Sequence, residues 1–171
     1  MPGSRPELLL VRGAPGVGKS SAVARLRRHL PKGAIIEVDA LRGMIAAVEW
    51  SNKQQHMLAL DHALLVSESF LERGFRPVVI IDTLGKSRLE AFLPLLTRSY
   101  AIVSLYAHPE RLTERVTARP EGQFKDLQAC HLLNEEMARY RYPQERFIDT
   151  SEMRPGQVAH ILLDELGGES A

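Results

Sequence analysis

Residues 13–20 read Gly13-Ala14-Pro15-Gly16-Val17-Gly18-Lys19-Ser20, and this stretch decides the fold. It matches the pattern G-x-x-x-x-G-K-[ST] at every fixed position, and that pattern is typical of a phosphate-binding loop. The short apolar run Leu8–Val11 precedes it and a helical pattern follows it. This strand–loop–helix setting is the context that supports the motif, so a chance glycine-rich turn beside a lysine is the weaker interpretation.

The residue types of the loop suit a triphosphate. Gly16 and Gly18 let the backbone approach the phosphates and adopt angles closed to other residues. The loop amides and the start of the following helix supply partial positive charge. Lys19 can reach the β- and γ-phosphates, and the Ser20 hydroxyl can ligate Mg²⁺. We therefore expect the whole motif, together with Ser21, to bind ATP with Mg²⁺.

Outside the loop, strand patterns alternate with helical patterns. Strands are predicted at Leu8–Val11, Ala34–Val38, Pro77–Asp82, Ala101–Tyr106 and Phe147–Ile148. Helices are predicted at Lys19–Leu30, Asn52–Arg73, Pro109–Arg119, about Asp126–Tyr140 and about Pro155–Leu166, with Gly74 as the cap of the second. A further helix is predicted to begin at the capping-box pattern Ser87–Glu90, and Pro94 either kinks this helix or delays its start. Such alternation predicts an α/β fold in which helices cover both faces of a five-stranded parallel sheet.

The composition is that of an ordinary folded chain. Its 171 residues are 44% hydrophobic and 25% charged, and at this length we expect a single domain spanning residues 1–171. The net charge of +1 excludes a strongly basic body that coats nucleic acid. The single cysteine, Cys130, excludes an intrachain disulfide. No apolar run approaches a membrane span of about 18 residues, and Leu8–Val11 is too short for a signal peptide, so we predict a cytoplasmic protein.

The motifs that would mark a nucleotide hydrolase are missing. The third predicted strand ends at Asp82-Thr83 without the glutamate that many ATPases use to position water. The only Asn-Lys pair, Asn52-Lys53, is followed by two glutamines rather than by the pattern of a guanine-reading loop. The sequence therefore predicts an enzyme that transfers a phosphoryl group rather than a GTPase or ATPase.

A carboxylate and an arginine follow the second predicted strand. Asp39 and Arg42 are three residues apart, which places both on one side of a helical turn. Ligands of parallel α/β sheets bind at the carboxyl ends of strands, and a carboxylate there can take the proton of an attacking hydroxyl. The alternative is that Asp39 only caps the helix that follows.

Three arginines recur at helical spacing in the predicted helix Pro109–Arg119. Arg111, Arg115 and Arg119 form one cationic stripe, and a mobile arginine can stabilise the charge of a transferring phosphoryl group. We favour Arg115 and Arg119, and we expect a lid over about residues 109–125 with a hinge at Pro120–Gly122. The alternative is a solvated helix face whose arginines pair with Glu110 and Glu114.

These pieces together resemble the small P-loop kinases of the polynucleotide 5′-kinase and zeta-toxin-like group. The resemblance rests on Gly13–Ser20, on Asp39 with Arg42, on the strand ending at Asp82 and on the arginine-rich lid. It implies a three-layer P-loop kinase fold. It also implies that Asp39 is the general base, that Arg42 contacts a phosphate of the acceptor and that Asp82 lies near the metal and the acceptor.

The same resemblance places the loop after the fifth strand, with Thr150, near the nucleotide base; a helix-capping turn is an equal alternative. The first expectation for the acceptor is a polynucleotide 5′-hydroxyl, on an RNA or DNA end. Kinases of shikimate, gluconate and antibiotics share the architecture, so a nucleotide sugar, a metabolite or an antibiotic stays open. A nucleotide-binding switch without transfer is the alternative of another class.

Overall fold

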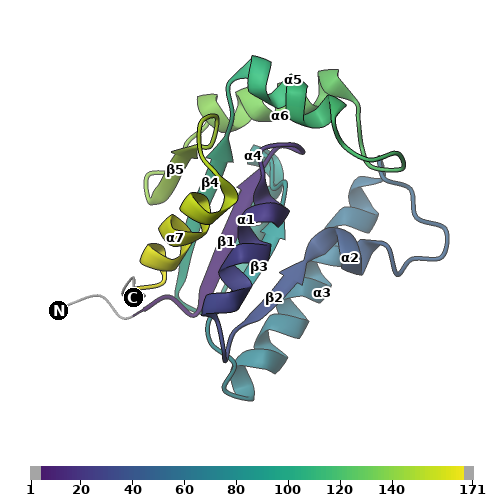
Figure 1. The fold of residues 1–171 in the computed structure, drawn as a ribbon. Helices are drawn as coiled ribbons and strands as arrows, with labels where there is room; N and C mark the ends of the chain where they lie inside the picture. The colour runs from purple at the N-terminus through teal and green to yellow at the C-terminus, as the bar shows by residue number, and fades with distance from the viewer. Residues whose placement is uncertain (1–4, 168–171) are drawn as a thin grey trace.

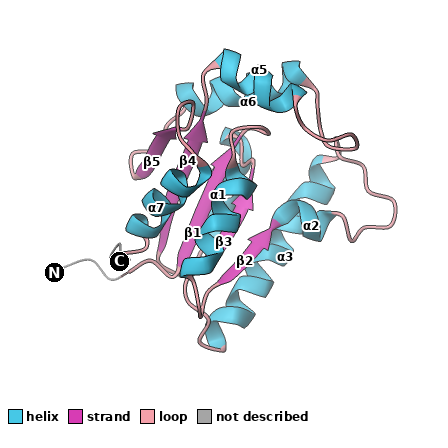
Figure 2. Ribbon diagram, viewed as in Figure 1, coloured by secondary structure: helices cyan, strands magenta, loops and turns pink. Residues whose placement is uncertain are grey.

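Five parallel strands form the centre of the molecule. The computed structural model describes residues 5–167, and its strands lie in the order β2-β3-β1-β4-β5 (Figure 1; Figure 2). Their bounds are β1 (Leu8–Gly13), β2 (Ala34–Glu37), β3 (Val78–Asp82), β4 (Tyr100–Tyr106) and β5 (Glu145–Asp149). Every neighbouring pair is parallel. The expectation of a five-stranded parallel sheet is confirmed, although β5 is longer than its predicted core at residues 147–148.

Helices cover both faces of this sheet, as its strand sequences require. All six residues of β1 are buried, and alternate side chains enter two separate cores. Leu9 and Val11 join the cluster under α1 (Lys19–Leu26) and α7 (Pro155–Glu165). Leu8 and Leu10 join the cluster under α3 (Lys53–Glu72) and α4 (Lys86–Phe92). A strand buried on both faces is mostly apolar, which explains the continuous run Leu8–Val11 in the sequence.

Two further helices lie across the carboxyl ends of the strands. In Figure 1, α5 (Pro109–Thr117) and α6 (Leu127–Arg139) sit at the top of the sheet. Asn134 of α6 docks on the end of β4, because its side chain donates to Ala107 O at 2.7 Å and accepts from Ala107 N at 3.3 Å. Leu112 and Val116 of α5 are buried in the same core as α1. The phosphate-binding loop is therefore covered by the predicted lid region.

Several element ends differ from the sequence prediction. The first helix ends at Leu26 and continues only as a 3₁₀ turn at Arg27–His29. The predicted last strand residue, Val38, is instead the first residue of the short helix α2 (Val38–Arg42). Asn52 caps α3 by accepting from the backbone N–H groups of residues 54 and 55. Gly74 follows that helix with a φ of 82°, in agreement with its expected place.

The predicted capping box at Ser87–Glu90 is wrong. The residue before α4 is Gly85, which has no side chain to cap it, and Ser87 lies inside the helix. The carboxylate of Glu136, from α6, accepts the N–H of Lys86 instead. The helix is neither kinked nor delayed by Pro94, because it ends at Phe92 and the proline lies in a 3₁₀ turn at Leu93–Leu95. A contact from a distant helix has replaced the local cap.

One buried arginine ties the strands together. Arg12 of β1 is 1% exposed, and its guanidinium contacts Ser104 Oγ at 2.7 Å, Glu145 Oε2 at 2.8 Å and Leu84 O at 2.9 Å. These partners belong to β4, β5 and the loop after β3. A buried charge is tolerated only when it is paired and hydrogen-bonded.

Among residues 5–167, no helix combines the length and apolar character needed to cross a bilayer.

Candidate active site

The phosphate-binding loop joins β1 to α1, and its glycines adopt left-handed backbone angles. Gly16 has a φ of 93° and Gly18 has a φ of 100°. Gly16 also packs against α5, since a Cβ built there would lie 2.5 Å from Val116 Cγ2. Gly18 stands directly before α1 and contributes no side-chain cap to the helix. The first amides of α1 are thus left for an anion, as at other helix N-termini that bind phosphate.

Lys19 is the first residue of α1, and its side chain folds back onto the start of the loop. Its Nζ donates to Gly13 O at 2.6 Å and to Ala14 O at 3.0 Å. Burial lowers the pKa of Lys19 to about 8, and the negative charges of Asp82 and Asp39 oppose this shift. Arg119 is close enough to lower the pKa further. The ammonium group is therefore hydrogen-bonded to the loop and lies within the electrostatic influence of two carboxylates. A bound phosphate would stabilise its charged form further.

A cavity of about 620 Å³ opens beside the loop, within the range of small-molecule sites. It brings together many of the residues selected from the sequence. The lining comprises Pro15–Ser21, Glu37, Asp39, Arg115, Arg119, Gln123, Thr150, Met153, Pro155 and Val158. Of the sequence-selected residues, Gly13, Ala14, Arg42 and Asp82 are outside this lining. Glu37, Gln123 and Met153 were not selected from the sequence.

Asp39 stands in the cavity wall, in the first turn of α2. Its pKa is raised above the ordinary aspartate value, first by burial and then by the charge of Asp82. The helix cap is Glu37, without a side-chain cap bond, so the alternative that Asp39 only caps α2 is wrong. A carboxylate with a raised pKa that lines the same cavity as the phosphate-binding loop is chemically able to act as a general base.

Asp82 is buried at the end of β3, where it contacts a residue that the sequence did not single out. Its Oδ2 lies 2.7 Å from His56 Nε2 and accepts weakly from Leu84 N at 3.4 Å. His56 belongs to α3 and is 2% exposed. No local motif marks this histidine, because its partner is 26 residues away in the chain. Asp82 also influences the pKa values of Lys19 and Asp39, so it lies near both.

Arg42 is buried and braces the chain between α2 and α3. Its Nη2 donates to Glu49 O at 2.8 Å, to Trp50 O at 2.7 Å and to Asn52 O at 3.0 Å. The guanidinium carbon lies 5.1 Å from the centre of the Trp50 ring. The guanidinium is therefore engaged within the chain, outside the cavity wall where an acceptor phosphate was expected.

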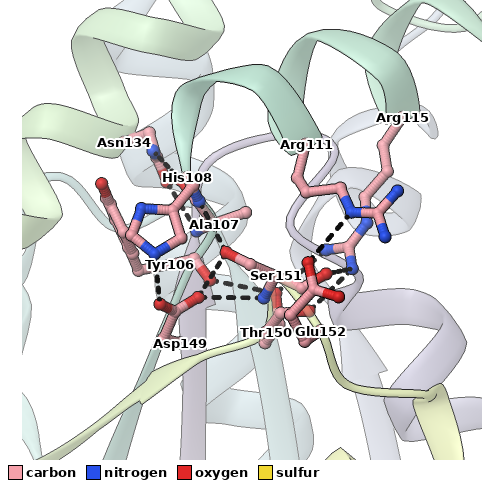
Figure 3. Close-up of polar contacts among 10 residues, drawn as sticks. All are labelled: Tyr106, Ala107, His108, Arg111, Arg115, Asn134, Asp149, Thr150, Ser151 and Glu152. Carbon is pink, nitrogen blue, oxygen red and sulfur yellow. Dashed lines mark hydrogen bonds and ion pairs between the residues drawn. The ribbon is translucent and has the colours of Figure 1, made fainter.

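Arg115 and Thr150 connect α5 to the phosphate-binding loop. In Figure 3, Arg115 extends from α5 toward the segment after β5. Its Nη2 donates to Thr150 O at 2.7 Å and its Nη1 to Thr150 Oγ1 at 3.0 Å. Thr150 Oγ1 in turn donates to Val17 O at 2.8 Å. Asp149 supports the same segment through His108, at 3.0 Å, and through Ser151.

The three arginines of the predicted stripe have different partners. Arg111 pairs with Glu114 at 2.8 Å and with Glu152 at 3.3 Å, so the solvated alternative describes it. Arg119 donates to Phe124 O at 2.7 Å and to Gln123 Oε1 at 3.0 Å. Only Arg115 and Arg119 of the three line the cavity.

The residues around the loop fit a nucleotide with Mg²⁺ better than a metal held by protein alone. Within residues 5–167 there is no group of three or more His, Cys, Asp or Glu side chains arranged to hold a metal. Mg²⁺ instead favours one or two protein oxygens together with phosphate oxygens. Ser20, in the first turn of α1, and Asp82, which lies near Lys19, carry oxygen atoms of this kind.

Comparison with solved structures supports the fold. The chain superposes on the tunicamycin resistance protein of Deinococcus radiodurans with a TM-score of 0.73, at 18% identity, over 96% of this chain and 98% of that one. A gluconokinase from Sinorhizobium meliloti gives a TM-score of 0.64, at 21% identity, over 96% and 94%. The Pnkp1/Rnl/Hen1 RNA repair complex gives 0.68, at 19% identity, over 80% of this chain and 45% of that one.

Sequence comparison adds no closer relative. No protein-family model matches the chain, and no curated protein matches it significantly. At these identities the structural likeness establishes the fold of the P-loop kinases and leaves the acceptor open.

Proposed function

Because the chain has the fold of the P-loop kinases, we propose that it transfers the γ-phosphoryl group of ATP to a hydroxyl group of an acceptor. One observation carries the proposal. Asp39, with a raised pKa, stands in the wall of the same cavity as the phosphate-binding loop. A switch that signals only by binding nucleotide has no use for a base beside the phosphates.

The loop and its helix hold the nucleotide. The amides at the start of α1 and the Nζ of Lys19 neutralise the phosphates, and Lys19 exchanges its bonds to Gly13 O and Ala14 O for phosphate oxygens. Ser20 and Asp82 would hold Mg²⁺, which would supply positive charge to the phosphates. Thr150, together with the apolar wall of Met153, Pro155 and Val158, lies on the nucleoside side of the cavity.

Asp39 prepares the acceptor. It accepts the proton of the acceptor hydroxyl while the hydroxyl oxygen forms its bond to the γ-phosphorus, and the bond from that phosphorus to the bridging oxygen of ADP breaks. Arg119, whose charge reaches Lys19, stabilises the transferring group. Residues 109–125 act as the lid, and the bonds of Arg115 to Thr150 link its movement to the phosphate loop.

The acceptor side of the cavity supports a small hydroxyl compound without a phosphate of its own. Glu37 and Asp39 place two carboxylates in its wall, and like charges repel an anionic acceptor. Arg42, the residue expected to grip an acceptor phosphate, is engaged by three carbonyl oxygens. A polynucleotide 5′-hydroxyl is the second candidate, favoured by the likeness to the RNA repair complex.

Labelled ATP offered with separate panels of acceptors tests both candidates. The panels are sugars and polyols, aminoglycoside, phenicol and nucleoside antibiotics, nucleotide sugars, and 5′-hydroxyl oligonucleotides. We expect transfer to a compound of the first two panels. Transfer to oligonucleotides alone would select the second candidate. ATP turnover that is independent of every hydroxyl would contradict the proposal and favour a hydrolase or a switch.

Replacement of Asp39 tests the role of the base. Asp39→Asn keeps the size of the side chain and should lower the transfer rate by about 10²- to 10⁴-fold, while the affinity for ATP changes by less than about threefold. Asp61→Asn, exposed on α3, is the matched control and should retain full activity. Loss of ATP binding in Asp39→Asn would show that Asp39 serves the nucleotide rather than the acceptor.

A further inference from the structure

His56 and Asp82 form a buried polar pair that the reaction outlined above does not explain. His56 Nε2 lies 2.7 Å from Asp82 Oδ2, and the two side chains are 3% and 1% exposed. His56 Nδ1 is also buried and has no hydrogen-bond partner among the described residues. Burying polar groups is unfavourable, and a buried nitrogen without a partner is especially so. A helix that only needed to pack on the sheet would do better with an apolar residue at this position.

The contact between the two side chains uses one nitrogen and one oxygen. His56 Nε2 and Asp82 Oδ2 lie 2.7 Å apart, within hydrogen-bond distance, and a carboxylate oxygen is an acceptor for such a bond. Within residues 5–167, the hydrogen bonds given by the structure to the Asp82 side chain both reach Oδ2, from His56 and from Leu84 N. Oδ1 is the oxygen left for a ligand.

The position of His56 is itself fixed by contacts with the segment between α2 and α3. Asn52 O accepts the backbone N–H of His56 at 3.2 Å and Arg42 Nη2 at 3.0 Å. Asn52 also caps α3 through its side chain. Arg42 therefore anchors the beginning of α3, and α3 presents His56 to Asp82. These contacts give Arg42 a structural role, because it fixes the start of the helix that carries His56.

We propose that His56 is a positioning residue for Asp82: it holds Oδ2 by a hydrogen bond, so that Oδ1 is oriented for the Mg²⁺ that accompanies ATP. The inference rests on the proposed function, because it assigns Asp82 to the nucleotide-bound metal. Residues that hydrogen-bond metal-ligating groups orient them, and their loss weakens metal affinity about 10- to 100-fold. A purely structural role would instead affect only the stability of the fold.

Two polar substitutions separate these roles, because each amide reproduces one ring nitrogen. Gln places its amide near the position of Nε2 and can donate to Asp82. Asn places its amide near the position of Nδ1 and is too short to replace that bond. His62→Asn, at an exposed position of the same helix, is the matched control.

The measurement is the binding of a fluorescent, non-hydrolysable ATP analogue as a function of Mg²⁺ concentration. For His56→Asn we expect the Mg²⁺ concentration at half-maximal binding to rise about tenfold or more. For His56→Gln and His62→Asn we expect it to stay within about threefold of the original protein. Thermal unfolding is recorded in parallel, so that a loss of stability is distinguished from a loss of metal affinity.

A second measurement uses Asp82→Asn, which removes the ionised carboxylate. If His56 acts through Asp82, adding His56→Asn to Asp82→Asn should change the Mg²⁺ dependence by less than about twofold, since the effects of coupled residues are not additive. Equal Mg²⁺ curves for His56→Asn and His56→Gln, or additive effects with Asp82→Asn, would overturn the inference. Failure of the unmodified protein to transfer phosphate to any acceptor would instead overturn the proposed function, and the binding curves would still decide the role of His56.

Discussion

Two glycines of the phosphate-binding loop offer a sharp test of the loop geometry. Gly16 and Gly18 have nearly the same φ, 93° and 100°, but they differ in surroundings. A Cβ at Gly18 would meet nothing within 4 Å, whereas a Cβ at Gly16 would lie 2.5 Å from Val116 Cγ2 and 3.1 Å from Leu112 Cδ1. Alanine has the same unfavourable backbone angle at either position, but only at position 16 does its Cβ also clash with α5.

The magnitudes follow from these distances. A left-handed backbone costs alanine about 1–2 kcal/mol, and this is the whole expected destabilisation in Gly18→Ala. Overpacking a buried contact adds about 1–3 kcal/mol in Gly16→Ala. The smaller conformational freedom of unfolded alanine affects both variants equally and cancels in the comparison. At this chain length, about 2–4 °C of melting temperature per kcal/mol separates the two variants by roughly 2–12 °C.

Thermal and urea unfolding of the protein without nucleotide measure the difference directly. Val116→Ala removes the methyl groups that the new Cβ would meet, so Gly16→Ala combined with Val116→Ala should be more stable than the sum of the single effects by about 1–3 kcal/mol. Equal destabilisation by Gly16→Ala and Gly18→Ala, or strict additivity with Val116→Ala, would refute the contact between the loop and α5.

Three further predictions concern charge, the lid and the helix cap. The charged form of Lys19 is the one expected to bind phosphate, and its pKa is lowered to about 8, so kcat/KM for ATP should fall above about pH 8; a profile that stays level to pH 10 would contradict this role. The acidic limb should reflect Asp39, whose pKa is raised, and an acidic limb that persists unchanged in Asp39→Asn would contradict that assignment. Arg115→Lys removes the two parallel hydrogen bonds to Thr150 O and Thr150 Oγ1, and the loss of one charge-assisted bond should raise KM for ATP about tenfold. The control Arg111→Lys, at an exposed ion pair, should change KM less than about twofold, and equal effects of the two variants in initial-rate assays would contradict a role of Arg115 in the site. Glu136→Met removes the carboxylate that accepts a hydrogen bond from the Lys86 N–H and should lower the free energy of unfolding by about 1 kcal/mol, whereas Glu136→Gln keeps an acceptor and most of the stability. Equal urea midpoints for these two variants would show that α4 needs no such cap.

The features predicted correctly from the sequence are those whose causes are local. The phosphate-binding loop is a contiguous pattern, and the strands are apolar runs that must be buried on both faces of a parallel sheet. The position of Asp39 in the wall of the cavity beside the loop also has a local cause, because Asp39 comes just after a strand and the carboxyl ends of parallel strands meet at one edge; its role as a base stays a prediction. In each case the residue and its physical reason lie within a few positions of one another.

The features missed from the sequence depend on residues far apart in the chain. His56 lies 26 residues from Asp82, and Arg115 lies 98 residues from Val17, whose carbonyl it approaches. The local capping box at Ser87 was displaced by Glu136 on another helix. Local preferences of about 1 kcal/mol are easily outweighed when packing offers a competing partner.

The amino-acid order alone thus determined that this chain builds a parallel sheet with a glycine-rich loop at the carboxyl end of β1, because the loop and the strands are specified by neighbouring residues. Only the tertiary structure decided what the buried charges do there. It assigned Arg42 to three backbone carbonyls and His56 to Asp82. A buried polar group must find its partner wherever the fold brings one within hydrogen-bond distance, and no spacing along the sequence records that choice.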